Sequence, residues 1–336
     1  MPNERQPTEG PPTRQRRGAW ARYWASGAAH SCVGTFGDRY GGAIAEFWRP
    51  VFANLAGRAR VLDIATGNGA LPRLLLDHCR DPRVTCDAID FAAVRPSWLS
   101  PLPDDERSRV RFHGDVDAAS LPFEDRCFDL VVSQYGFEYA EIDRALPEVL
   151  RVRAPQGGVA MVLHHAAGRP ATLAAIEIGH LRWLSAAGGL LDAAEALVGP
   201  MARAATPEGR ATLRSDATAN AARERFNALQ GELSHRAAGD GADILFEARD
   251  AMAAIFSLAG QRGAAPARDA LRTLRDDYAA SEARLDDLRE HALDAVRAAS
   301  LRDRMSSAVD SPGQLGELRE QGGHLMGWFL KVLPRR

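Results

Sequence analysis

The chain of 336 residues is long enough for about two domains. It carries 42 Lys and Arg against 44 Asp and Glu, and this net charge of −2 excludes a protein built as a whole to coat nucleic acid or an acidic membrane. Apolar residues make up 46% and charged residues 26% of the chain, which are the proportions of a folded globular protein. It contains no run of 18 apolar residues, so we expect no membrane-spanning helix.

The beginning of the sequence and the cysteines both favour a cytoplasmic protein. The chain opens with MPNERQPTEGPPTRQRRG, which lacks the apolar stretch of a secretory signal. The four cysteines form no CxxC pair and have no histidine at metal-ligand spacing. We therefore expect neither a disulfide framework nor a metal site. The cysteines are Cys32, Cys79, Cys86 and Cys127.

The N-terminal part of the chain divides into a tail and an aromatic-rich segment. Residues 1–17 are rich in Pro, Gln, Arg and Glu and are predicted to form a flexible tail. Residues 18–60 contain aromatic side chains at helical spacing, among them Trp20, Tyr23 and Trp24. We expect helices here that either pack on the next domain or cover a ligand site.

Residues 61–165 alternate between short apolar runs and stretches that are compatible with helices. Strands that alternate with helices favour crossover connections and a parallel sheet with helices on both faces. The expected fold class is therefore α/β and doubly wound. The predicted strands are Val61–Ala65, Val84–Ile89, Val110–Phe112, Leu130–Ser133 and Val159–Leu163.

Residues 166–300 are rich in Ala, Leu, Arg, Asp and Glu and are predicted to be entirely helical. Thr206-Pro207-Glu208 has the capping hydroxyl, the proline and the acid that begin a helix. Between Leu271 and Ala295, apolar residues recur at steps of three and four, which indicates a long amphipathic helix with a narrow apolar seam. This seam could pack within its own chain or form a homodimer.

The final segment, residues 301–336, returns to strand-like sequence. His324–Leu333 reads HLMGWFLKVL, and Arg304–Val309 is a second candidate strand. We expect these strands to rejoin the sheet of residues 61–165. The helical segment 166–300 would then be an insertion before the last strands.

The segment VLDIATGNGA, at residues 61–70, carries the first functional signal. Gly67 and Gly69 allow a tight turn from a strand into a helix, whose free N–H groups attract an anion. Asp63 precedes the turn, and its carboxylate would repel a pyrophosphate but attract an ammonium group. Pro72 stands where a nicotinamide-binding loop has its third glycine. These features favour a nucleoside that carries an amino acid.

Further acids follow the next two predicted strands. Asp90 lies about 20 residues after Gly69, which is the spacing of an acid that binds ribose hydroxyls. Asp87 is the alternative. The segment DVDA at residues 115–118 offers carboxylates that can accept a hydrogen bond from an adenine amino group.

Together these motifs resemble those of the class I S-adenosylmethionine-dependent methyltransferases. VLDIATGNGA is similar to the first motif of this family, and AIDFA is similar to its acidic second motif. DAASLPFEDRCFDLVVSQYGFEY resembles the segment around the fourth strand, and LRVRAPQGGVAMVL the turn into the fifth. The resemblance covers residues 61–165, and the later WFLKV resembles the antiparallel seventh strand. It implies a mostly parallel, seven-stranded, Rossmann-like sheet with a large helical insertion.

The resemblance also implies a site for S-adenosylmethionine. Asp63 and the two loop glycines would hold the methionine part, and Asp90 the ribose hydroxyls. Asp117 would bind adenine, with Asp115 as the alternative. Ala65 stands where the family often has glycine. The full set of expected cofactor residues is Asp63, Ala65, Gly67, Gly69, Asp90, Phe91, Asp117, Ala118, Ser133, Gln134 and Tyr40.

The expected chemistry needs little acid–base catalysis. A sulfonium sulfur is a good leaving group, so the protein mainly aligns the acceptor behind the methyl group and excludes water. Ser133 and Gln134 would lie beside the sulfur. His164 and His165, directly after the fifth strand, are well placed for a base, with a structural hydrogen-bonding role as the alternative. The full set of candidates for a base is Tyr135, Glu138, Tyr139, His164 and His165.

The main functional hypothesis is methyl transfer to oxygen, nitrogen or carbon of a small molecule. Residues 133–136 read SQYG and lack the Asn/Asp-Pro-Pro-Tyr/Phe motif of enzymes that methylate the amino groups of adenine or glutamine. A protein or RNA acceptor is the first alternative, because residues 1–60 contain more Arg than acidic residues. A non-catalytic S-adenosylmethionine-binding or helical interaction protein is the second. We expect no membrane partner, and the helical insertion is predicted to cap the substrate or to form a dimer.

Overall fold

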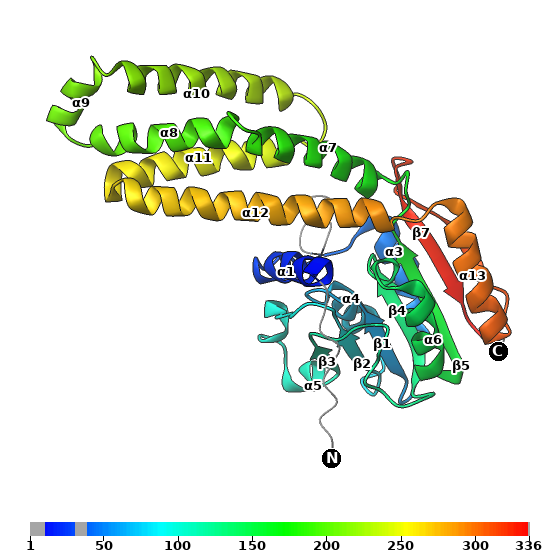
Figure 1. Cartoon of the computed structure of the whole chain (residues 1–336). Helices are drawn as coiled ribbons and strands as arrows, with labels where there is room; N and C mark the ends of the chain where they lie inside the picture. Colours follow the sequence, from blue (N-terminus) through cyan, green and yellow to red (C-terminus); the bar gives the residue numbers. More distant parts are fainter. Residues whose placement is uncertain (1–10, 31–38, 335–336) are drawn as a thin grey trace. The chain divides into compact units, whose positions relative to one another are not determined.

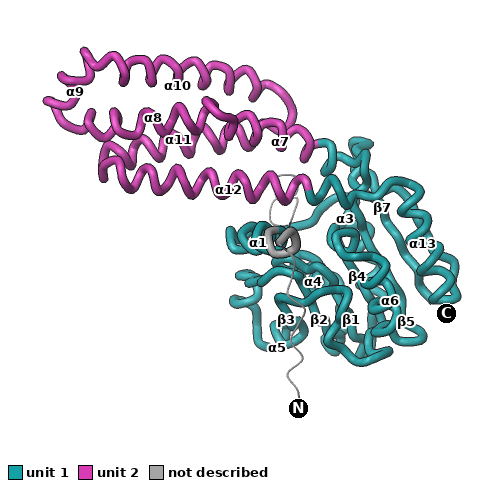
Figure 2. The backbone as a smooth tube through the Cα atoms, viewed as in Figure 1, with its two compact units in different colours: residues 1–172, 287–336 teal, residues 173–286 magenta. Residues whose placement is uncertain are grey.

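The computed structural model describes residues 11–30 and 39–334. The chain divides into two compact units (Figure 2): residues 1–172 with 287–336, and residues 173–286. We call the first the sheet unit, because it holds the β-sheet, and the second the helical unit. Figure 1 labels the elements of both.

The sheet has seven strands in the order β3-β2-β1-β4-β5-β7-β6. The strands β1 to β5 pair in parallel, whereas β7 pairs antiparallel with both β5 and β6. This confirms the predicted seven-stranded, mostly parallel sheet and the late antiparallel strand. The strands are β1 (Arg60–Ile64), β2 (Thr85–Ile89), β3 (Val110–His113), β4 (Phe128–Gln134), β5 (Arg153–Leu163), β6 (Gln314–Arg319) and β7 (Leu325–Val332).

Both faces of the sheet are covered by helices, and this explains why the central strands read as continuous apolar runs. Neighbouring residues of a strand point to opposite faces. Val61 therefore belongs to one apolar core and Leu62 to the other. The helices and short turns of the sheet unit are α1 (Pro11–Ala25), α3 (Gly42–Ala53), α4 (Ala70–His78), η1 (Ser97–Leu99), α5 (Asp104–Arg107), η2 (Phe137–Tyr139), α6 (Ile142–Val152) and α13 (Ala295–Val309).

The two cores place different helices on the two faces. On one face, Trp48 of α3 and Leu74 of α4 pack with Val132 of β4. On the other face, Val149 of α6 and Leu301 of α13 belong to the second core. This arrangement leaves the carboxyl ends of β1, β2 and β4 open to the loops that follow them.

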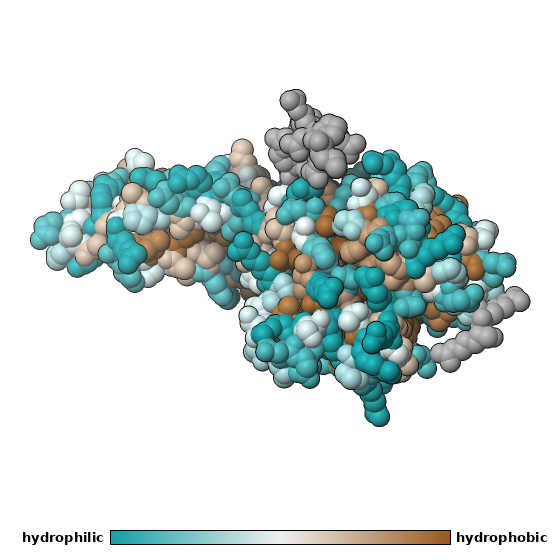
Figure 3. Space-filling view, turned by 90° about the horizontal axis from the view of Figure 1, so that it is seen from below, coloured by the Kyte–Doolittle hydropathy of each residue, from teal (hydrophilic) through white to brown (hydrophobic). Residues whose placement is uncertain are grey.

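The helical unit consists of antiparallel segments joined by short turns (Figure 1). Thr206 begins one of these helices as predicted, since its hydroxyl accepts a hydrogen bond from the Gly209 N–H at 3.1 Å. Hydrophilic side chains predominate on the visible face of this unit, and hydrophobic ones form a narrow band along it (Figure 3). Its helices are α8 (Leu190–Arg203), α9 (Pro207–Leu213), α10 (Ala217–Arg236) and α11 (Asp243–Arg262), with α7 (Arg169–Ser185) and α12 (Ala264–His291) crossing its boundaries.

The chain leaves the sheet unit and returns to it at one place. His165 and Leu293 form an isolated parallel β-bridge. The Ala166 N–H donates to the Leu293 carbonyl at 2.9 Å, and the Leu293 N–H donates to the His164 carbonyl at 2.8 Å. Residues 173–286 are therefore inserted between two chain segments that are hydrogen-bonded to each other. Within residues 11–30 and 39–334, every helix is too short or too polar to cross a bilayer.

Three boundaries differ from the sequence predictions. The segment Arg304–Val309 is not a strand but the end of α13, and its buried Met305 and Val309 are spaced by one helical turn. The long amphipathic helix α12 ends at His291, and Ala295 begins the next helix.

The third difference concerns the predicted tail of residues 1–17. Helix α1 begins at Pro11, which lies inside that segment. Arg16 and Arg17 extend the helix because their side chains find partners elsewhere in the sheet unit. Residues 1–10 lie outside the described part of the chain, and for them the predicted tail stays a prediction.

Candidate cofactor site

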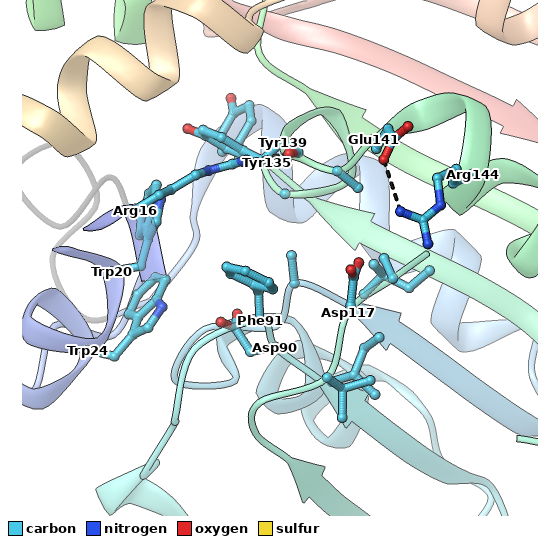
Figure 4. A pocket seen from close by; sticks show the side chains of 17 residues that line it. Arg16, Trp20, Trp24, Asp90, Phe91, Asp117, Tyr135, Tyr139, Glu141 and Arg144 are labelled. Atoms are coloured by element: carbon cyan, nitrogen blue, oxygen red, sulfur yellow. Dashed lines mark hydrogen bonds and ion pairs between the residues drawn. The ribbon is translucent and has the colours of Figure 1, made fainter. Parts of the chain in front are cut away.

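A cavity of about 300 Å³ lies at the carboxyl ends of β1, β2 and β4. The chain runs from β1 to β2 on one side and β4 lies on the other, which is where doubly wound sheets bind ligands. In Figure 4, Trp20 and Trp24 of α1 line one side of this cavity, and Asp117 lies opposite. We call it the larger cavity, because a second, smaller cavity adjoins it. The residues around it are Arg16, Trp20, Trp24, Ile64, Ala65, Ile89, Asp90, Phe91, Val116, Asp117, Ala118, Tyr135, Gly136, Tyr139, Ala140, Glu141 and Arg144.

A smaller cavity of about 20 Å³ shares part of this wall. The two cavities have Trp20, Trp24, Ala65 and Tyr135 in common. The smaller cavity adds polar residues from β1, from the loop after it and from β4. Its remaining wall residues are His30, Tyr40, Asp63, Thr66, Ala70, Leu71 and Gln134.

Asp63 is the most unusual group in the smaller cavity. Its side chain is 1% exposed, and neither carboxylate oxygen accepts a hydrogen bond from the described residues. Burial raises its pKa to about 8, the Thr66 side chain opposes this shift, and the nearby Asp90 carboxylate adds to it. A buried carboxylate without a cationic partner is costly. It therefore marks the place where a cationic ligand group would be stabilised.

Two further polar groups beside Asp63 are buried without a partner among the described residues. They are the hydroxyl of Thr66 and the Nε2 group of Gln134. The Oε1 atom of Gln134 accepts a hydrogen bond from the Trp48 indole at 2.6 Å, which leaves Nε2 as a donor. The Asp63 carboxylate can pair with an ammonium group, and the Thr66 and Gln134 donors can bind a carboxylate. Together they complement a free amino acid, which carries both groups.

Asp90 connects the glycine-rich loop to the larger cavity. Its Oδ2 accepts a hydrogen bond from the Gly67 N–H at 2.8 Å, and its Oδ1 accepts one from the Ala92 N–H at 2.9 Å. Burial raises the pKa of Asp90 to about 6, and these two hydrogen bonds oppose that shift. Each oxygen retains a lone pair for a hydroxyl group of a ligand.

The end of the larger cavity near Asp117 is mainly apolar. Phe91, Val116 and Ala118 contribute to this wall, with the carboxylate of Asp117 beside them. Asp117 Oδ1 accepts a hydrogen bond from the Ala119 N–H at 2.9 Å, which fixes its orientation. An apolar wall with one acceptor suits a planar base that carries an amino group.

The structure separates these acids from their alternatives. Asp115 is largely exposed, lies 3.8 Å from Arg17 in an ion pair and lines neither of the described cavities. Asp87 is buried, but its oxygens pair with Arg60 and His113, each at 3.0 Å. The predicted set of Asp63, Asp90 and Asp117 is therefore the set that faces the two cavities.

The loop glycines act differently from the expectation. Gly67 and Gly69 have φ values of +55° and +81°, which other residues rarely adopt. A Cβ atom on Gly67 would lie 2.6 Å from the Trp24 ring, and one on Gly69 would lie 2.5 Å from the Phe112 ring. The glycines thus admit aromatic rings onto the loop, and neither residue lines the described cavities.

Ser133 also lies outside both cavity walls. Its hydroxyl donates to the Ile64 carbonyl at 2.8 Å and accepts from the Phe137 N–H at 3.0 Å. It therefore ties β4 to β1 and to η2. Tyr40, by contrast, lines the smaller cavity and stacks on His30 with ring centroids 4.1 Å apart.

Of the candidates for a base, Tyr135 and Tyr139 line a cavity, whereas His164, His165 and Glu138 do not. His164 and Glu138 are fully buried, and His164 Nδ1 lies 2.8 Å from Glu138 Oε1. His165 stacks on Trp328 with ring centroids 4.3 Å apart. These contacts correspond to the structural alternative for the two histidines.

Sequence reasoning missed the contribution of Arg16. Its Nε donates to Asp287 Oδ2 at 2.7 Å, and the Trp20 indole donates to the same oxygen at 2.9 Å. The spacing of Trp20 and Trp24 indicates a helix, but Asp287 lies 271 residues after Arg16. Such a partner leaves no local signal in the sequence. Thr66 and Arg144 were also missed, and Arg144 pairs with Glu141 at 3.2 Å (Figure 4).

Known proteins resemble the segment that builds this site. Residues 61–157 match the family described as a methyltransferase domain. A demethylmenaquinone methyltransferase of Thermus thermophilus is 37% identical over 99 residues, which are 29% of this chain and 44% of that protein. A malonyl-[acyl-carrier protein] O-methyltransferase of Geobacter sulfurreducens is 34% identical over 114 residues, or 34% of this chain and 41% of that protein.

The solved structure of the YcgJ protein from Bacillus subtilis matches this chain with 25% sequence identity. The match covers 41% of this chain and 58% of the YcgJ chain, with a TM-score of 0.32. The chain spans less than half the length of the two curated relatives. The similarity to a methyltransferase domain thus concerns residues 61–157. The resemblance to the class I S-adenosylmethionine-dependent methyltransferases is confirmed for this segment.

Proposed function

We propose that this protein transfers a methyl group from S-adenosylmethionine to a small-molecule acceptor. The observation that carries the proposal is the buried Asp63 carboxylate, which lacks a partner among the described residues and lies in a cavity that adjoins Asp90 and Asp117. The matching domain family and the names of both relatives support the activity.

The residues of both cavities fit the parts of this cofactor. Asp63 would pair with its ammonium group, with Thr66 and Gln134 beside its carboxylate. Asp90 would accept hydrogen bonds from the ribose hydroxyls, and Asp117 from the adenine amino group. When bound, S-adenosylmethionine supplies an electrophilic methyl group.

The protein's own contribution is mainly positioning. Tyr135 adopts a φ of +54° at the end of β4, its hydroxyl donates to the Met326 carbonyl at 3.0 Å, and its ring stacks on His164 at 4.2 Å between centroids. We infer that Glu138 and His164 hold Tyr135 in place as positioning residues. The aromatic side chains of the cavity wall would help to exclude water from the reacting atoms.

We propose a small-molecule acceptor because the names of the relatives specify their substrates. One name specifies demethylmenaquinone, and the other specifies a malonyl group that is carried on an acyl-carrier protein. One name specifies methylation at oxygen. We leave oxygen, nitrogen and carbon open as the methylated atom in this protein.

Isothermal titration calorimetry with S-adenosylmethionine tests the proposal. We expect binding by the intact protein and a loss of about 100-fold in Asp63→Ala, because one charge-assisted pair is removed. Asp87→Ala is the matched control, since Asp87 is also a buried strand acid but lines neither described cavity. Absence of binding by the intact protein would contradict the proposal.

A second measurement tests the acceptor class. The protein is incubated with cell extract and with S-adenosylmethionine labelled at its methyl group. We expect the label in the small-molecule fraction. Label in RNA or on the side chains of a protein would favour the alternative acceptors, and S-adenosylmethionine binding without any transfer would favour a non-catalytic protein.

A further inference from the structure

A pair of a histidine and an acid lies beside the larger cavity, at the end of α12. His291 Nδ1 lies 3.0 Å from Oδ1 of Asp287, one helical turn earlier. The His291 ring lies beside the Tyr139 ring, with centroids 5.5 Å apart. Tyr139 follows β4 in η2 and lines the larger cavity, so His291 adjoins a residue of the cavity wall.

The contacts of this pair leave one imidazole nitrogen available. Nδ1 of His291 also lies 2.9 Å from the Asp287 carbonyl oxygen. Both partners of Nδ1 are acceptors, so Nδ1 carries a hydrogen and Nε2 of the neutral ring carries a lone pair. Nε2 makes no hydrogen bond within residues 11–30 and 39–334, and the His291 side chain is 24% exposed. Nε2 can therefore accept a proton from a ligand.

The orientation of Asp287 is fixed from its other side. Its Oδ2 accepts hydrogen bonds from Arg16 at 2.7 Å and from the Trp20 indole at 2.9 Å. Oδ1 thus remains directed to His291, where a carboxylate stabilises the positive ring that forms when Nε2 takes up a proton. Arg16 and Trp20 themselves line the larger cavity.

The two histidines after β5 lack this combination of an acid partner and an accessible nitrogen. His164 pairs with Glu138, but both side chains are fully buried. His165 is 13% exposed, and its nearest acid oxygen, on Glu317, lies 4.0 Å from Nε2. A base has to reach the proton that it removes, which favours His291.

We propose that His291 is the general base for a hydroxyl acceptor, and that Asp287 is the residue that positions it. The inference rests on the proposed function. The acceptor oxygen forms a bond to the methyl group, while the bond between methyl and sulfur breaks and leaves its electron pair on the sulfur. The hydroxyl proton moves to Nε2 of His291 and from there to water. A hydroxyl group keeps its proton at neutral pH and benefits from a base, whereas a carboxylate acceptor is already ionised.

The rate of transfer should then depend on pH. Burial lowers the pKa of His291 and the Arg16 charge acts in the same direction, but Asp287 outweighs both and holds this pKa above its ordinary value. The neutral ring is the form that accepts a proton. At saturating S-adenosylmethionine, the rate should therefore rise as the pH rises through the pKa of His291.

The test measures initial rates of label transfer from methyl-labelled S-adenosylmethionine to small molecules extracted from cells. We expect His291→Gln to be about 100-fold slower and to lose the rise with pH, which is the loss typical of a missing general base. Its affinity for S-adenosylmethionine, measured by calorimetry, should stay within about threefold. His324→Gln is the matched control, because His324 is exposed and lines neither described cavity.

Nuclear magnetic resonance of the imidazole nitrogens adds a measurement that needs neither a variant nor an acceptor. We expect the neutral ring of His291 to carry its hydrogen on Nδ1. A hydrogen on Nε2 would overturn the inference, and so would transfer by His291→Gln at the rate and pH dependence of the unmodified protein. Absence of transfer by the unmodified protein would overturn the proposed function, and the inference with it.

Discussion

At the scale of single residues, Asp63 links protonation to ligand binding. Burial raises its pKa to about 8, so at pH 7 the carboxyl group of the ligand-free protein is mostly protonated. An ammonium partner stabilises the ionised carboxylate. Binding of S-adenosylmethionine should therefore release a proton from Asp63.

This link predicts that the affinity for S-adenosylmethionine rises with pH. Between pH 6 and 7.5 we expect an increase of about 20-fold, because the ionised fraction of Asp63 rises as the pH approaches its pKa of about 8. Calorimetry in buffers of different ionisation enthalpy measures both the affinity and the released proton. In Asp63→Asn the proton release should disappear. An affinity that stays constant or falls over this range would contradict the assignment.

Asp63 should also lower the stability of the ligand-free protein at high pH. Its pKa is raised in the folded state, so the folded protein binds more protons than the unfolded chain between about pH 4 and 8. Stability is therefore lost as the pH rises through this range. We expect Asp63→Asn to raise the free energy of unfolding at pH 8 by about 1–3 kcal/mol, because it removes an unpaired buried charge.

Urea unfolding of the protein and of Asp63→Asn at pH 5 and pH 8 measures this effect. The gain in stability should shrink at pH 5, where Asp63 is protonated in the folded state. A variant that is less stable than the unmodified protein at pH 8 would show that Asp63 has a partner in the folded state.

At the scale of elements, a buried acid attaches α1 to the sheet unit. Asp287, near the end of α12, accepts hydrogen bonds from Arg16 and Trp20, and its Oδ1 lies 3.0 Å from His291 Nδ1. Burial favours a raised pKa for Asp287, but His291, Arg16 and Trp20 outweigh it and hold the pKa below its ordinary value. Burial likewise opposes the charge of His291, but Asp287 raises its pKa.

The pKa shifts of Asp287 and His291 limit the pH range in which both residues stabilise the attachment of α1. The contribution of Asp287 is present above its pKa in the unfolded chain and is lost as the pH falls through its lowered folded pKa. The contribution of His291 is present below its unfolded pKa and is lost as the pH rises through its raised folded pKa. The attachment of α1 should therefore be strongest at mildly acidic pH, where both groups are charged.

Asp287→Asn should loosen α1 and weaken cofactor binding about tenfold, because Trp20 and Trp24 would lose their support. Hydrogen exchange of the backbone amides in residues 16–25 measures the loosening. Asp143→Asn is a suitable control, since Asp143 forms an exposed ion pair with Arg304. Unchanged exchange in Asp287→Asn would show that the aromatic contacts alone hold the helix.

At the scale of the whole molecule, every wall residue of the two described cavities belongs to the sheet unit. The segments that lead into and out of the insertion are joined through His165 and Leu293. The walls of these two cavities thus contain none of residues 173–286. The predicted roles of the helical unit, in covering the acceptor or in forming a homodimer, stay predictions.

A chain in which residues 173–286 are replaced by a short glycine-rich linker should therefore still bind S-adenosylmethionine, within about threefold of the intact affinity. Calorimetry measures the affinity, and circular dichroism checks that the sheet is folded. A folded variant that no longer binds would show that the helical unit contributes to the site.

Patterns in the sequence predicted the doubly wound, mostly parallel sheet and the three acids that face the cavities. These depend on local patterns, because the alternation of buried residues and the position of an acid at a strand end are set by neighbours along the chain. It also indicated the insertion, since the change of composition after residue 165 is local too.

Only the tertiary structure decided which groups meet across long stretches of chain. Arg16, which was expected to lie in a tail, belongs to helix α1 and pairs with Asp287, and the Trp24 ring packs on Gly67. Likewise, the buried state of Asp63 depends on helix α1 and on β4, which lie far from it in the sequence. Contacts between side chains that lie far apart in the sequence depend on the fold, so they leave no local pattern along the chain.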